Sequence, residues 1–126
     1  MKKELNIQKK IMLAVSKLQT KIFRNNVGTA WTGKTQKTKD GGIYIKEPRP
    51  FKAGLCVGSS DLIGWTTKTV TPEMVGQKVA IFTALEIKTQ RGVASPQQKN
   101  FIKVIKESGG FAGVARSEAD AVKIVS

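Results

Sequence analysis

The fold is decided by Lys78–Lys88, which reads KVAIFTALEIK and is apolar on both faces for most of its length. Such a run is typical of a central strand that is covered on both sides. A single carboxylate, Glu86, interrupts it near its end. Two-residue periodicity predicts that Glu86 and Lys88 project from the same face of this strand. Leu85 and Ile87 then project from the other face.

The residues that follow this strand predict a helix, a short strand and a final helix. Ser95 is a favourable N-cap and Pro96 fits the first helical position, so a helix begins there. Its inner stripe consists of Phe101, Ile102 and Ile105. The pair Gly109-Gly110 ends this helix, residues 111–115 form the strand, and Ser117 caps the final helix.

The residues that precede the central strand predict one more helix and two more strands. Apolar residues recur at helical spacing within residues 4–19, and residues 21–24 read as a short strand. A second strand signal surrounds residues 61–63, and residues 66–77 are a connection. Residues 25–50 are rich in Gly, Thr and Lys and predict a long loop or hairpin insertion, with a turn at Gly41-Gly42 before a minor strand. Long loops of this kind in compact domains are often functional.

The order of these elements is helix, strands, helix, strand, helix. It predicts an α/β fold in which helices flank a mixed central sheet. The chain has 126 residues, enough for one core, and contains no internal repeat. We therefore expect a single domain over residues 1–126.

The composition excludes several kinds of active site. The chain has no histidine and one cysteine, Cys56, so it has no internal disulfide, no Cys/His zinc site and no histidine-dependent nucleophile. Any metal must therefore be bound by oxygen ligands, which favours Mg²⁺, Mn²⁺ or Ca²⁺. No apolar run suits a signal peptide or a membrane span, so we expect a soluble, cytoplasmic protein that does not bind membranes.

The net charge points to a polyanionic partner. Twenty-two Lys and Arg residues against nine Asp and Glu residues give a formal charge of +13. Nucleic acid is the commonest partner of so basic a protein. The alternatives are a basic surface that is merely solvated, or an anionic membrane.

Asp61, Glu86 and Lys88 are the residues that suggest chemistry. A carboxylate at the end of a central strand must be compensated by a cation, because leaving it unpaired is costly. If the strands of Asp61 and Glu86 are neighbours, both acids can converge on one Mg²⁺ ion, which activates water and polarises a phosphate. Lys88 can then stabilise the charge of the transition state. The alternative is a purely structural Glu86–Lys88 ion pair.

Four motifs occur in order along the chain: GSSDLIG at 58–64, FTALEIKT at 82–89, SPQQKNF at 95–101 and GGFAGVA at 109–115. Together they resemble the VRR-NUC nuclease family of the PD-(D/E)XK superfamily, whose fold is restriction-endonuclease-like. A fifth segment, residues 23–28, extends the resemblance to nearly the whole chain. The short length is similar to that of stand-alone phage and bacterial members of the family.

The resemblance implies a role for individual residues. Asp61 and Glu86 are the expected metal ligands, together with the backbone carbonyl of Ile87. Lys88 is the expected catalytic lysine, and Gln98 matches a motif glutamine that faces the active site. Glu4 is the only acid on the first helix that can match a further glutamate of the family.

Some of these residues have structural alternatives. Gln98 lies three residues after Ser95, at the spacing of a capping box. Glu4 can simply favour the dipole of the first helix. Other residues are candidates for DNA binding or for simple turn and surface positions: Arg24, Asn25, Asn26, Lys34, Lys37 and Lys39. Three aromatic residues can stack on unpaired bases, although packing is the alternative for each: Trp31, Tyr44 and Trp65.

The resemblance implies a Mg²⁺- or Mn²⁺-dependent endodeoxyribonuclease without an organic cofactor. Stand-alone members resemble Holliday junction resolvases, which act as homodimers on branched DNA, so we expect the same here, in the cytoplasm of a phage host. The alternatives are a flap, nicking or restriction-like nuclease, or a non-catalytic basic DNA-binding module. A module that only binds DNA gains nothing from carboxylates directed at phosphates, which favours the enzyme.

Overall fold

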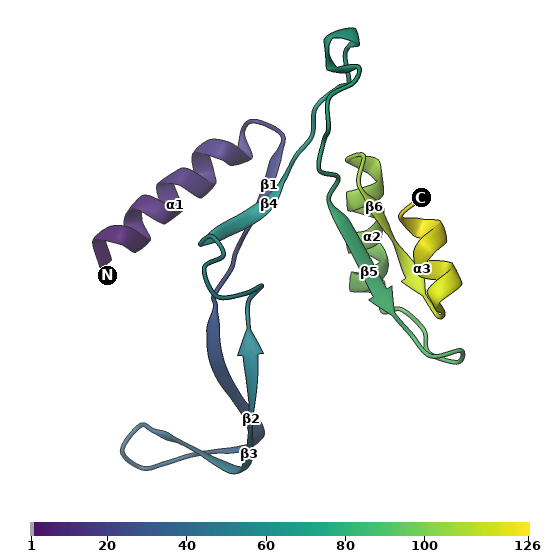
Figure 1. Ribbon diagram of the computed structural model, residues 1–126. Helices are drawn as coiled ribbons and strands as arrows, with labels where there is room; N and C mark the ends of the chain where they lie inside the picture. Colours follow the sequence, from purple (N-terminus) through teal and green to yellow (C-terminus); the bar gives the residue numbers. More distant parts are fainter. Residues whose placement is uncertain (1) are drawn as a thin grey trace. The chain divides into compact units, whose positions relative to one another are not determined.

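Three α-helices and six strands follow one another along residues 2–126, which are the residues that the computed structural model describes (Figure 1). The chain divides into two compact units, one of residues 1–16 and 21–64 and one of residues 17–20 and 65–126. A short 3₁₀ helix, η1 (Pro72–Met74), lies in the second unit. The elements are α1 (Lys2–Ser16), β1 (Thr20–Arg24), β2 (Gly28–Lys37), β3 (Ile43–Ala53), β4 (Leu62–Thr66), β5 (Thr83–Ile87), α2 (Pro96–Glu107), β6 (Phe111–Ala115) and α3 (Glu118–Ile124).

The described strands pair as three two-stranded sheets, β1 with β4, β2 with β3, and β5 with β6. The mixed α/β class expected from the sequence is therefore confirmed. Each of these sheets has two strands, and β5 and β6 lie in the second unit. Our expectation of one domain over residues 1–126 stays a prediction.

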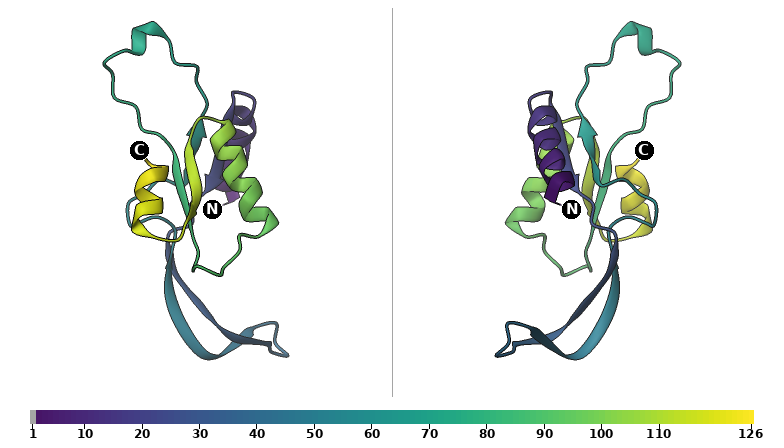
Figure 2. Two further views of the ribbon diagram at one scale, coloured as in Figure 1. Left: turned by 90° about the vertical axis from the view of Figure 1, so that its right-hand side faces the viewer. Right: turned by 90° about the vertical axis from the view of Figure 1, so that its left-hand side faces the viewer.

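In the first unit, β2 and β3 form a long antiparallel ribbon that projects from β1 and β4 (Figures 1 and 2). A bulge interrupts the ribbon, because Glu47 and Pro48 on β3 lie opposite Gly33 alone on β2. Gly33 has a φ of +156° there, and a Cβ atom on it would meet Cγ2 of Ile45 at 2.7 Å. The sequence predicted a long loop or hairpin insertion with one minor strand at this place, since the mostly polar strands lack an apolar face.

In the second unit, β5, α2 and β6 form a βαβ unit with two parallel strands. A parallel pair needs a crossover connection, and α2 supplies it. Helices α2 and α3 lie on opposite sides of the strand pair (Figure 2). On the α3 side, Ile124 packs so closely that a Cβ atom on Gly113 would lie 2.8 Å from its Cδ1 atom.

The core of the second unit is small. Its fully buried residues are Ile105, which is 1 % exposed, and three alanines, Ala94, Ala112 and Ala115. Trp65 extends this core, since its ring lies 4.6 Å from that of Phe82. The predicted helices at 95–108 and after Ser117 and the strand at 111–115 are all found.

The central strand is where the prediction from sequence was wrong. Only Thr83–Ile87 of the run pairs as a strand, and residues 78–82 have no regular structure. Within the second unit β5 is covered on one face only, because Leu85 is 38 % exposed and Ile87 is 69 % exposed. The reason is that α3 packs against β6, so the outer face of β5 has no helix over it.

The first helix is also shorter at its C-terminal end than predicted. It ends at Ser16, whose hydroxyl donates to the carbonyl of Leu13. At 15 residues, α1 is the longest described helix, and none of the described helices has the length and apolarity needed to span a membrane.

Candidate active site

Glu86 and Lys88 form an ion pair on the half-buried face of β5. The Nζ atom of Lys88 lies 3.3 Å from Oε1 of Glu86, with the two side chains 22 % and 30 % exposed respectively. Two-residue periodicity therefore predicted the shared face of these residues correctly. Lys88 lies just past the strand, where its backbone N–H donates to the carbonyl of Ala115 and extends the pairing with β6.

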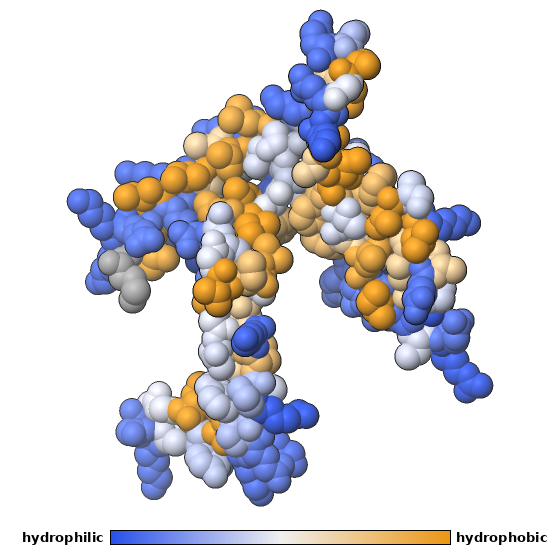
Figure 3. All heavy atoms as spheres, in the orientation of Figure 1, coloured by the Kyte–Doolittle hydropathy of each residue, from blue (hydrophilic) through white to orange (hydrophobic). Residues whose placement is uncertain are grey.

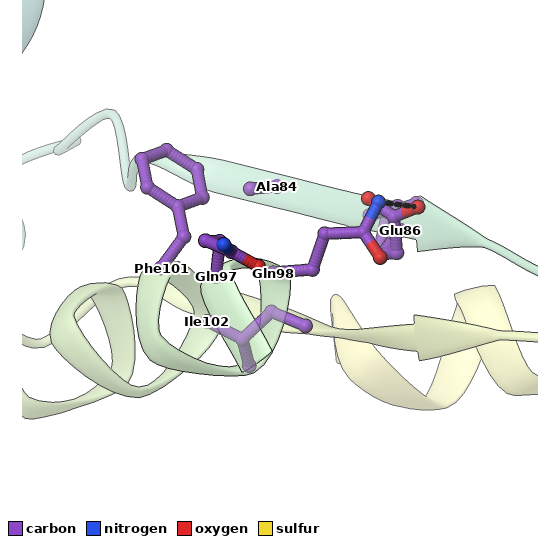
Figure 4. A pocket seen from close by; sticks show the side chains of 7 residues that line it. Ala84, Glu86, Gln97, Gln98, Phe101 and Ile102 are labelled. Atoms are coloured by element: carbon purple, nitrogen blue, oxygen red, sulfur yellow. Dashed lines mark hydrogen bonds between the residues drawn. The ribbon is translucent and has the colours of Figure 1, made fainter. Parts of the chain in front are cut away.

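Gln98 joins this pair from the first turn of α2. Its Nε2 atom donates to Oε1 of Glu86 over 2.9 Å (Figure 4). Its Oε1 atom accepts from the backbone N–H of Ser95 at 2.9 Å, and the Ser95 hydroxyl accepts from the N–H of Gln98. The capping box and a position facing Glu86 and Lys88 were alternatives for Gln98 in the sequence, and one side chain does both.

A cavity of about 360 Å³ opens beside these residues. Ala84 and Glu86 enter it from β5, while Gln98, Phe101 and Ile102 enter it from α2 (Figure 4). The cavity is mostly apolar, with the Glu86 carboxylate at one end. A charged group against an apolar wall is less hydrated than on an open surface, which strengthens its interactions with neighbouring charges.

Arg116 is a supporting residue that sequence reasoning missed. Its Nη1 atom donates to the carbonyls of Thr89 at 2.5 Å and Gly92 at 2.7 Å, which closes the turn directly after Lys88. Gly92 packs on the side chain of Lys88, since a Cβ atom there would lie 3.4 Å from its Cβ and Cδ atoms. The parallel pairing of Ile87 with Ala115 is what brings Arg116 beside this turn. Knowledge of the register between β5 and β6 would have been needed to predict the position of Arg116.

Asp61 lies in the first compact unit, just before β4. Its side chain is exposed, and its backbone carbonyl accepts from the N–H of Asn25 at 2.8 Å. The amide of Asn25 also donates to the Ser59 hydroxyl and the Ser60 carbonyl, and it accepts from the N–H of Leu55. Asn25 therefore supports the loop that carries Asp61.

The remaining candidates also lie in the first unit, except Trp65. Glu4 is exposed in the first turn of α1, and Arg24 and Asn26 are exposed at the end of β1 and after it. Lys34, Lys37 and Lys39 are exposed on the ribbon or its tip. Trp31 and Tyr44 are exposed there too, whereas Trp65 packs between Phe82 and Phe101 in the second unit, as the packing alternative predicted.

The carboxylate oxygens of Glu86 are the type of ligand that a hard divalent cation prefers. Oε1 of Glu86 accepts from both Gln98 and Lys88, and Oε2 has no hydrogen bond or ion pair within residues 2–126. This arrangement fixes the carboxylate through one oxygen and leaves the other available to a ligand. Residues 2–126 contain no cluster of three or more acids or cysteines that could hold a metal.

The sequence profile of the VRR-NUC domain matches residues 7–119, most of the chain. The chain belongs to the VRR-NUC family. No match was found among curated proteins or among solved structures. The VRR-NUC domain is a nuclease domain with a restriction-endonuclease-like fold, so the resemblance and the fold class inferred from the sequence are confirmed.

Membership in the VRR-NUC family makes this protein a nuclease with DNA as its substrate class. VRR-NUC nucleases generally use divalent metal ions, in agreement with an oxygen-only donor set. The matched region covers most of both units and includes every candidate residue except Glu4.

Proposed function

We propose that this VRR-NUC protein is a Mg²⁺-dependent endodeoxyribonuclease that cuts branched DNA as a homodimer, in the manner of a Holliday junction resolvase. The observation that carries the proposal is the arrangement of Glu86, Lys88 and Gln98 around one carboxylate oxygen, beside a cavity. A nuclease needs a fixed carboxylate and a cation next to each other, and here Gln98 fixes the Glu86 carboxylate while Lys88 supplies the cation.

Each residue of the site has a distinct part in the proposed reaction. Asp61, Glu86 and the carbonyl of Ile87 would hold Mg²⁺, which supplies an activated water and a polarised phosphoryl oxygen. Lys88 stabilises the negative charge that develops on the phosphate. Gln98 keeps the Glu86 carboxylate in one orientation, since its own position is fixed by the helix cap. We include Glu4 as a further metal ligand on the strength of the family resemblance alone.

We propose Arg24, Asn26, Lys34, Lys37 and Lys39 as DNA contacts, because all of them are exposed. Asn25 was predicted to join them. Its amide is occupied by internal hydrogen bonds, and we therefore propose a supporting role for it instead.

Symmetry supports the homodimer. Resolution of a four-way junction needs two symmetric cuts, and a two-fold dimer presents two active sites related by the same operation. The formal charge of +13 suits recognition of branch shape and phosphate rather than base sequence.

The test uses labelled four-way junctions, flaps, nicked duplexes and linear duplexes, each incubated with Mg²⁺, with Mn²⁺ or with EDTA. Paired cuts close to the crossover, dependent on metal and absent in Glu86→Ala, would establish the proposal. Metal-dependent cutting of the other forms but not of the junction would retain the nuclease and reject the resolvase. Binding without cutting in any metal would reject catalysis.

A further inference from the structure

The β2–β3 ribbon has no core of its own. Its strands of 10 and 11 residues are exposed at every position except Ala30, Ile45 and Ala53. A two-stranded ribbon without a buried face is only marginally stable in water. The long β2–β3 ribbon therefore adds little to the stability of the first unit, and its length needs another explanation.

The cations of the ribbon lack acidic partners. Residues 28–53 contain six Lys and Arg residues and two acids, Asp40 and Glu47. The ion pairs within residues 2–126 join Lys88 to Glu86 and Lys103 to Glu107, so no ribbon cation takes part in one. Asp40 is engaged locally by the Thr38 hydroxyl and the N–H of Gly42. The ribbon thus carries a net positive charge that the protein itself does not neutralise, and hydrophilic side chains gather over its outer part (Figure 3).

The register places two of these cations face to face. Lys34 on β2 lies directly opposite Lys46 on β3, and Gln36 lies opposite Tyr44. Directly opposed residues share a face, as do residues two apart along a strand, so both pairs lie on one face. Like charges in such a cross-strand pair destabilise a ribbon. An anion bound between the two lysines would replace their mutual repulsion with two attractive interactions and so stabilise the ribbon.

The bulge forms a hollow next to the lysine pair. It has a volume of about 580 Å³, and its lining residues include Lys34, Lys46, Glu47 and Arg49. Glu47 has a φ of +52°, an uncommon value for a residue other than glycine. The bulge therefore bends the ribbon at the place where three cations converge. Tyr44, 58 % exposed on the same face, offers a ring beside them.

We propose that this face of the ribbon, Lys34, Lys46 and Tyr44 with Arg49 at the bulge, binds the sugar-phosphate backbone of a DNA arm. This inference rests on the proposed function, and it assigns DNA binding to one surface of the ribbon. A two-stranded ribbon is narrow enough to enter the major groove of a duplex, where phosphates flank it on both sides. A second copy of this chain fits the ribbon less well, because its ribbon would bring the same unpaired positive charges.

The test compares two double variants with equal loss of charge. Lys34→Gln/Lys46→Gln removes the facing pair, and Lys9→Gln/Lys10→Gln removes two adjacent lysines of α1 as the control. Binding of a labelled junction and of a duplex is measured by fluorescence anisotropy in EDTA across a range of salt concentrations. Because no cutting occurs in EDTA, cleavage by the wild-type chain in Mg²⁺ tests the proposed function separately.

The ribbon variant is expected to reduce the slope of log K against log salt by about 1.8, because each phosphate contact contributes about 0.9. It should weaken binding at least about tenfold at about 0.1 M salt, while the control leaves the slope nearly unchanged. The thermal midpoint of the ribbon variant should stay the same or rise, since a like-charge pair is removed. A loss of binding through unfolding would lower it.

Two results would overturn the inference. Equal slopes for the two double variants would mean that only total charge matters. An unchanged slope together with a shift from dimer to monomer, measured by light scattering, would make the ribbon an interface between copies of the chain.

Discussion

Gln98 links the first turn of α2 to the carboxylate of Glu86, because its Nε2 atom donates to Oε1 of Glu86 over 2.9 Å while its Oε1 atom caps the helix at Ser95. The side chain that caps α2 therefore also orients the carboxylate of Glu86. This coupling lets one residue serve stability and the proposed chemistry together.

Gln98→Glu should separate these two roles. A glutamate still accepts from the Ser95 N–H and keeps the capping box, but it no longer donates to Glu86. The new carboxylate also repels that of Glu86, so we expect the thermal midpoint to fall at neutral pH and to recover as the pH is lowered. The single-turnover rate of DNA cleavage should fall about tenfold to a hundredfold.

The control for that experiment is Ser95→Ala, which removes the cap and leaves the amide of Gln98 able to donate. It should cost about 1 kcal/mol of stability and retain most of the cleavage rate. Equal cleavage by Gln98→Glu and the wild-type chain would show that the contact with Glu86 has no part in the reaction.

Arg116→Gln should loosen the turn after Lys88. The variant loses the donors to Thr89 and Gly92, at a cost of about 1–3 kcal/mol, mainly because the part-buried Gly92 carbonyl is left without its donor. Hydrogen exchange of the Gly92 amide, which donates to Thr89, should accelerate, and the cleavage rate should fall while DNA affinity stays the same. Arg91→Gln is the matched control, because it removes the same charge from an exposed position in that turn. Equal exchange rates in the two variants would refute the role of Arg116.

The contrast between these residues shows what sequence can predict. Ser95, Pro96 and the Gly109-Gly110 pair define α2 by local rules, and α2 begins and ends where those rules place it. Glu86 and Lys88 share a face because periodicity along one strand is local as well. The contact of Gln98 with Glu86 and the bonds of Arg116 depend on the pairing of β5 with β6, which no local pattern contains.

Long-range pairing also explains why the extents of three strands in the structure differ from those predicted. Residues 78–82 are apolar enough for a strand, but pairing with β6 begins only at Thr83, where Phe111 lies opposite. The polar β2 and β3 strands are long despite a weak strand pattern, because their backbone pairing continues past a bulge.

Gly110→Ala should destabilise the protein by overpacking. A Cβ atom there would lie 2.6 Å from Cγ2 of Ile105 and 2.8 Å from the carbonyl oxygen of Phe82. We expect a loss of about 1–3 kcal/mol in the free energy of unfolding, measured with urea. Gly28→Ala is the control, because nothing lies within 4 Å of its Cβ position. Equal midpoints would mean that β6 can move away from Ile105 at no cost.

The tip of the ribbon should respond to acid. The Thr38 hydroxyl, followed by the N–H of Gly42, holds the pKa of Asp40 below its ordinary value. A lowered carboxyl pKa stabilises the turn above the unfolded pKa, and this stabilisation is lost as the pH falls through the folded pKa. In a ¹³C NMR titration, Thr38→Val should raise the pKa of Asp40, whereas Thr35→Val should leave it unchanged. An unaltered value in Thr38→Val would contradict the assignment.

In the proposed reaction, Glu86 contributes to DNA cleavage through the negative charge of its carboxylate. Glu86→Gln keeps the size and the hydrogen-bonding length of the side chain and removes only the negative charge. The decisive measurement is the single-turnover rate of DNA cleavage in Mg²⁺ for this variant and the wild-type chain, with DNA affinity measured in parallel. We expect the rate to fall at least about a hundredfold while DNA affinity is retained. A variant that cuts DNA as fast as the wild-type chain would contradict this expectation.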